Sequence, residues 1–137
     1  MTVVKVEYIG DLKCRATHED SGATIETVAP KDNQGDGSKF SPTDLVGTAL
    51  GSCILTVMGI IAARRKLDLN GTTVEIIKEM ATAPHRRIGK LLATVRFNKV
   101  FEGQDRVMLE HGAHTCPVHK SLHPDIEAPI TFIYPNA

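Results

Sequence analysis

Cysteine is the residue type in this sequence best suited to chemistry, and the chain has three: Cys14, Cys53 and Cys116. An odd number fits poorly with the paired disulfides of a secreted scaffold, and a reducing cytosol would leave all three as thiols. Thiols that ionise near neutral pH are nucleophiles, and peroxides oxidise them to sulfenic acids. Cysteine chemistry is therefore the first hypothesis.

Cys116 lies directly before Pro117. Proline favours the first position of a helix, so this order predicts that Cys116 caps a helix running to His123. The unpaired N–H groups and the dipole at a helix start favour thiolate over thiol, so we expect the pKa of Cys116 to be lowered. A helix cap that only happens to be cysteine is the alternative.

Cys53 lies in a long apolar segment, where a lone cysteine is usually a small buried hydrophobic residue. Paired with Cys116, however, it provides what a two-cysteine peroxidase requires. One thiolate attacks the O–O bond and becomes a sulfenic acid, and the other thiol condenses with it to a disulfide. Cys14 lies in a predicted strand with no helix end to activate it, so we interpret it as structural.

A zinc site is another possible use of the region around Cys116. Cys116 and His119 are three residues apart, and His119 and His123 are four apart, spacings at which ligands on one helix converge. Zinc usually takes three or four protein ligands, and the sequence has no second clustered pair such as Cys-x-x-Cys. We therefore expect no metal and no cofactor, and interpret the histidines as solvated. The sequence motifs of serine hydrolases and zinc proteases are also missing.

The chain is expected to begin with three strands. Apolar and charged residues alternate over 4–8, as in a half-buried strand. Further strands over 12–18 and 23–28 are separated by a Glu-Asp-Ser-Gly turn, which predicts an antiparallel meander. The glycine-rich segment 30–40 lacks periodicity and is predicted to be a loop that covers a site.

A long helix is predicted from Pro42 to about Lys66. Ser41 as the N-cap, proline at the first helical position and Asp44 three residues after the cap form a strong start signal. Asp44 is interpreted as a capping acid.

The composition of this helix predicts what surrounds it. Apolar residues cover nearly its whole circumference, so it must be enclosed on all sides. Gly47 and Gly51, one turn apart, predict the close approach of another backbone, most naturally that of a helix. A small domain has few elements with which to surround so long a helix, so we expect an obligate homodimer.

The remaining elements complete an α+β fold in one domain, residues 1–137. They are a β-hairpin, two short helices and a closing strand, over 72–81 with 89–97, 105–113, 117–123 and 130–134.

Charge and hydropathy limit the expected partners and location. The 16 basic and 16 acidic side chains cancel, so we expect neither nucleic acid nor a membrane surface as a partner. The first residues lack the features of an export signal, which predicts a cytoplasmic protein. The longest apolar stretch, 54–63, is far shorter than the roughly 20 residues that cross a bilayer.

Two motifs resemble the OsmC/Ohr family, named for osmotically inducible protein C and organic hydroperoxide resistance. Ser-Pro-Thr-Asp-Leu at 41–45, leading to Ala-Leu-Gly-Ser-Cys at 49–53, is similar to the family's helix start and reactive cysteine. Cys-Pro-Val-His-Lys-Ser-Leu at 116–122 is similar to its second cysteine motif. The order of elements agrees over nearly the whole chain.

The resemblance implies an intertwined homodimer with two active sites at its interface. It implies reduction of organic hydroperoxides in preference to hydrogen peroxide, with Cys53 as the peroxidatic and Cys116 as the resolving residue. The reductant would be an external dithiol, typically a lipoylated protein. In family members a glutamate at the helix start pairs with an activating arginine. Here the matching position is Thr43, and segment 31–39 contains lysines but no arginine.

A non-catalytic function is the second hypothesis. The same fold could form a small dimeric binding protein whose apolar interface holds a hydrophobic ligand. Both Cys53 and Cys116 would then be packing residues.

Overall fold

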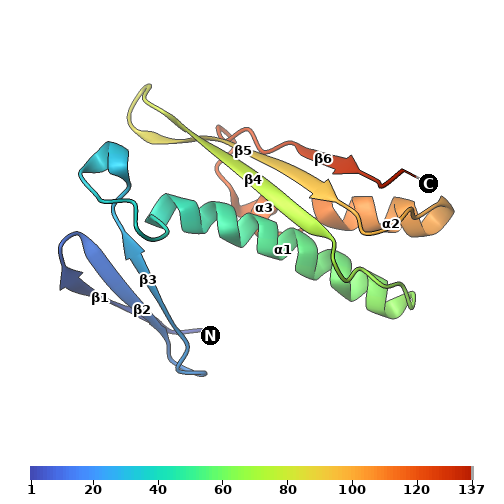
Figure 1. Cartoon of the computed structure of the whole chain (residues 1–137), viewed down its shortest axis with the longest axis horizontal. Helices are drawn as coiled ribbons and strands as arrows, with labels where there is room; N and C mark the ends of the chain where they lie inside the picture. Colours follow the sequence, from blue (N-terminus) through green and yellow to red (C-terminus); the bar gives the residue numbers. More distant parts are fainter. Residues whose placement is uncertain (137) are drawn as a thin grey trace. The chain divides into compact units, whose positions relative to one another are not determined.

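The computed structural model describes residues 1–136 of the chain. It contains two compact units, one ending at Val46 and the other beginning at Gly47 (Figure 1). The boundary falls inside the long helix α1, Pro42–Arg64. The prediction of a single domain stays a prediction.

The first unit contains the predicted antiparallel meander. Its strands are β1 (Val4–Gly10), β2 (Lys13–His18) and β3 (Thr24–Val28), in the order β1-β2-β3. The predicted loop after β3 contains a short 3-10 turn, η1 (Lys31–Asn33).

One face of this small sheet is apolar and exposed within the first unit. Val6 pairs with Ala16, and Ala16 with Ile25, so these side chains share one face. Val6 is 64% exposed and Ile25 is 52% exposed. Within residues 1–46 this face stays exposed, so the predicted strand is confirmed, while the predicted burial of its apolar side stays a prediction.

Helix α1 starts as predicted. The Asp44 N–H donates to Ser41 Oγ at 3.0 Å, and the Ser41 N–H donates to Asp44 Oδ2 at 2.9 Å. This reciprocal cap satisfies two backbone donors, and such a cap typically contributes about 0.5–2 kcal/mol. The interpretation of Asp44 as a capping acid is confirmed.

The burial of α1 differs from the prediction. The helix ends at Arg64 rather than Lys66, and the chain buries only one stripe of it. The buried residues follow helical spacing: Gly47, Leu50, Gly51, Ile54, Met58 and Ala62. The opposite side, including Ser52, Thr56 and Ile60, is exposed. The helix is thus not enclosed on all sides by its own chain.

By length and composition α1 could cross a membrane, with a mean hydropathy of 2.1, and within residues 1–136 it is the single helix of this kind. The argument from the short apolar stretch 54–63 therefore underestimated the segment. The core helix of a water-soluble protein meets the same criteria, and α1 buries a third of its most apolar window, 33%, in this chain.

The second unit combines the rest of α1 with a three-stranded sheet and two helices (Figure 1). The sheet has the order β4-β5-β6, with β4 and β5 antiparallel and β6 parallel to β5. The elements are β4 (Thr73–Ala81), β5 (Arg87–Arg96), α2 (Gly103–His114), α3 (Pro117–Ser121) and β6 (Ile130–Ile133). With its two small sheets and three α-helices, the fold is mixed α+β, as predicted.

Gly47 and Gly51 of α1 pack against the sheet rather than against a helix. A Cβ added at Gly47 or Gly51 would come within 3.3 Å of the Ile76 side chain on β4. The helix neighbour is instead α2, whose Gly112 lies against Val57 and Ile61 of α1. The predicted close approach to Gly47 and Gly51 exists, but it is made by a strand. The glycine that faces a helix is Gly112 of α2.

Candidate active site

The structure brings two of the three thiols together in the second unit. Cys53 is a half-buried residue of α1, one turn before Val57. Cys116 follows α2 and caps the start of α3, with its side chain 0% exposed. The two side chains are joined by a hydrogen bond. Residues 63 positions apart in the sequence thus form a contact that the sequence alone could not establish.

The cap at α3 has the predicted geometry. Cys116 Sγ accepts a hydrogen bond from the His119 N–H at 3.3 Å, and Pro117 occupies the first helical position. The Lys120 N–H donates to the Cys116 carbonyl oxygen at 3.1 Å, closing the first turn. Cys116 is therefore fixed by both its side chain and its backbone.

The pKa of Cys116 nevertheless departs from the prediction. Burial, the largest cause, raises the pKa of this thiol above its usual value. The hydrogen bond from the His119 N–H acts to lower it, and the hydrogen bond with Cys53 raises it. The predicted lowering is wrong because a five-residue helix provides too little stabilisation to offset the loss of water around a charged sulfur.

The raised pKa favours the protonated form of the Cys116 thiol. A protonated thiol can both donate and accept a hydrogen bond. Cys53 is partly exposed and Cys116 is not, so Cys53 is the more accessible of the two sulfurs.

The histidines near Cys116 have structural partners. His119 Nε2 lies 2.9 Å from the Ala128 carbonyl oxygen. The prediction that this ring is only solvated is therefore wrong. His114 packs edge-on against Phe132 of β6, with ring centroids 5.8 Å apart. Helix α3 ends at Ser121, so His123 lies outside the helix and loses the spacing that suggested zinc. Among residues 1–136 no group of three potential ligands could hold a metal ion.

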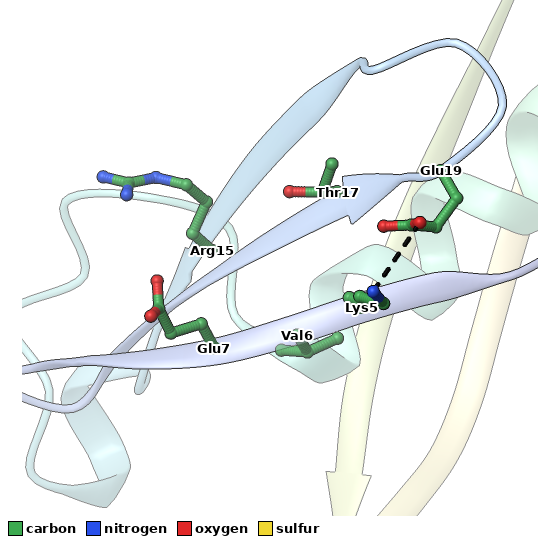
Figure 2. A pocket seen from close by; sticks show the side chains of 6 residues that line it. All are labelled: Lys5, Val6, Glu7, Arg15, Thr17 and Glu19. Atoms are coloured by element: carbon green, nitrogen blue, oxygen red, sulfur yellow. Dashed lines mark ion pairs between the residues drawn. The ribbon is translucent and has the colours of Figure 1, made fainter.

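The third cysteine, Cys14, lies in the first unit beside Arg15. Cys14 is a half-buried free thiol of β2, opposite Tyr8 in the register. Arg15, the next residue, extends over the polar face of the same sheet, near an open hollow of about 530 Å³ (Figure 2). Its guanidinium pairs with Glu26 on β3 at 3.5 Å. Within this unit Arg15 is thus a cross-strand ion-pair residue.

Comparison with known proteins identifies the family. The family described as OsmC-like protein matches residues 35–130, which include both cysteines of the hydrogen-bonded pair. The chain belongs to the OsmC-like family. A search of curated proteins found no match.

Solved structures agree with this assignment. One from Psychrobacter arcticus 273-4, provisionally described as an osmotic stress induced and detoxification response protein, is 45% identical with a TM-score of 0.90, covering 96% of both chains. An organic hydroperoxide resistance protein OsmC from Legionella pneumophila is 12% identical, with a TM-score of 0.77 over 97% of this chain and 96% of that one. The organic hydroperoxide resistance protein OhrB of Bacillus subtilis is 14% identical, with a TM-score of 0.70 over 96% and 97%. The last two establish the shared fold alone.

Proposed function

We propose that this OsmC-like protein is a thiol peroxidase that reduces organic hydroperoxides in oxidative stress defence. The observation that carries the proposal is the hydrogen bond between a half-buried Cys53 and a fully buried Cys116. Relatives of the same fold are organic hydroperoxide resistance proteins, which supports this choice of substrate.

In the first step the Cys53 thiolate attacks the distal oxygen of the hydroperoxide. The O–O bond breaks, an S–O bond forms, and the alcohol leaves after taking up a proton. Cys53 is thereby oxidised to a sulfenic acid and the hydroperoxide is reduced. Cys116 supports this step as the hydrogen-bond donor that stabilises the attacking sulfur.

In the second step Cys116 resolves the sulfenic acid. Its sulfur attacks Cys53 Sγ, the S–O bond breaks, and the thiol proton leaves with the hydroxyl group as water. An external dithiol then reduces the disulfide and returns both thiols. A lipoylated protein would suit this role, and a reducing cytoplasm would be the location in which the cycle runs.

The pairing of the two cysteines is tested by mass spectrometry. After one equivalent of cumene hydroperoxide, added anaerobically without reductant, we expect a disulfide-linked peptide pair containing Cys53 and Cys116. Cys14 should remain alkylatable in the same sample, which provides an internal control. Peptides in which Cys53 stays a free thiol after the peroxide is consumed would contradict the mechanism.

We also propose that the working form is an intertwined homodimer. The exposed side of α1 and the apolar face of the first sheet together leave several large apolar residues in water, among them Val4, Val6, Tyr8, Ile25 and Ile60. Apolar surface of this extent on a small chain favours association. In a symmetric homodimer, a second copy of this chain would cover that apolar surface.

Sedimentation at micromolar concentration is expected to give twice the 14.9 kDa mass of one chain. Replacing Val6 and Ile25 by lysine should shift the protein toward the monomer, whereas replacing the exposed Thr56 by serine should not. A wild-type protein that sediments as a monomer at these concentrations would contradict the dimer.

A further inference from the structure

Gly112 is a residue of α2 whose missing side chain is explained by packing rather than by backbone conformation. It lies inside the helix and is not among the glycines with a positive φ. Alanine adopts this backbone conformation without strain and would stabilise the helix by about 0.5–1 kcal/mol relative to glycine. The space at this position, however, is occupied. A Cβ here would overlap Cδ1 of Ile61 and lie 3.6 Å from Cγ1 of Val57, both on α1, so either the end of the Ile61 side chain or α2 itself would have to shift.

The residues that Gly112 contacts lie on the same side of α1 as the candidate nucleophile. Cys53, Val57 and Ile61 follow one another at four-residue spacing, so they form a single stripe along the helix. We call these three residues the Cys53 stripe. Where α2 meets this stripe, it sets the distance between α1 and the chain that leads to Cys116.

Only a short stretch of chain separates Gly112 from Cys116. The Gly112 carbonyl accepts hydrogen bonds from the Thr115 N–H at 3.0 Å and from Thr115 Oγ1 at 2.9 Å. Thr115 directly precedes Cys116. The backbone of Gly112 therefore holds the turn that delivers the second thiol, and Cys116 Sγ reaches Cys53 at the other end of the stripe.

We infer that Gly112 is a positioning residue for disulfide formation between Cys53 and Cys116. The inference rests on the proposed function for its biological meaning, but its geometry can be tested separately. A disulfide requires its two Cβ atoms about 3.5–4.5 Å apart, so a displacement of about 1 Å at the helix contact impairs the reaction. The first step, attack by Cys53 on an oxidant from solvent, forms no bond to Cys116, so it depends on this contact only through the hydrogen bond between the two sulfurs.

The test follows reaction with dithiobis(nitrobenzoate), an aromatic disulfide, in a Cys14→Ser background. Cys53 displaces one nitrothiobenzoate and forms a mixed disulfide. Cys116 then attacks the Cys53 sulfur, displaces the second nitrothiobenzoate and forms the intramolecular disulfide. The two releases give separate absorbance phases, and neither involves a peroxide.

In Gly112→Ala we expect the second phase to slow about threefold or more, because it needs the two sulfurs within bonding distance, and the first phase to slow less, because it needs only the hydrogen bond between them. The double variant Gly112→Ala with Ile61→Val lacks the Cδ1 atom that the new methyl group would meet, and its second phase should return toward the parent rate. Gly59→Ala is the matched control, because a Cβ at Gly59 meets nothing within 4 Å.

Equal second phases in Gly112→Ala and the parent, with unchanged circular dichroism, would overturn the positioning role. Failure of the double variant to recover would do the same. If the parent shows both phases but consumes no cumene hydroperoxide, the proposed peroxidase function fails while the role of Gly112 stands.

Discussion

The Cys53→Ser protein is expected to consume organic hydroperoxides no faster than a solution without enzyme, a loss on the order of 10³-fold or more. The reason is chemical, because a serine hydroxyl near neutral pH is not ionised and does not attack an O–O bond. The measurement is cumene hydroperoxide consumption with a dithiol as reductant, together with circular dichroism to verify folding. Serine is nearly isosteric with cysteine, so α1 should keep its structure.

Cys14→Ser is the matched control for this experiment. Cys14 is also half-buried, but it lies in a strand of the first sheet and pairs in register with Tyr8 and Thr27. We expect its replacement to leave turnover within about twofold. Unchanged turnover in Cys53→Ser would remove Cys53 from the mechanism and favour the binding-protein hypothesis, in which both cysteines only pack.

The Cys116→Ser protein is expected to react once and then be inactivated. Its Cys53 should form a sulfenic acid, but without a second thiol nearby, excess hydroperoxide should oxidise this further to sulfinic acid, which dithiols do not reduce. Intact mass after peroxide and then dithiol should return to the starting value in the wild type. In the variant it should retain two oxygen atoms on Cys53.

This substitution preserves the local structure on which its interpretation depends. A serine hydroxyl is a good helix cap and can accept the hydrogen bond that the His119 N–H now donates to Cys116 Sγ at 3.3 Å. The start of α3 should therefore persist, and circular dichroism can verify it. A Cys116→Ser protein that recovers fully after excess peroxide would show that Cys116 does not protect Cys53.

Local signals in the sequence were sufficient for most of the elements. The alternation in 4–8, the Ser-Pro-Thr-Asp start of α1 and the Cys-Pro start of α3 each act over a few residues, and all three elements lie where they were predicted. Their ends are less certain, because a helix end depends on the next contacts of the chain. Helix α3 ends at Ser121, two residues before the predicted His123.

Partners across the fold could not be predicted in the same way. Gly47 and Gly51 indicated a close neighbour, but only the packing identified it as Ile76 of β4. Gly112 gave no signal of its own, since a lone glycine near a helix end is commonly a cap. The state of Cys116 was also mispredicted, because the effect of a helix start can be read locally whereas burial by distant residues cannot.

The sequence alone indicated which thiols are candidates for reaction, which helices present them and the family to which the chain belongs, because those properties depend on residues close together along the chain. The tertiary structure decided that Cys53 and Cys116 share a hydrogen bond, that burial raises the pKa of Cys116, and that Gly112 lies against Val57 and Ile61 of α1. These properties depend on desolvation and on contacts between segments distant in sequence, which only the folded chain creates.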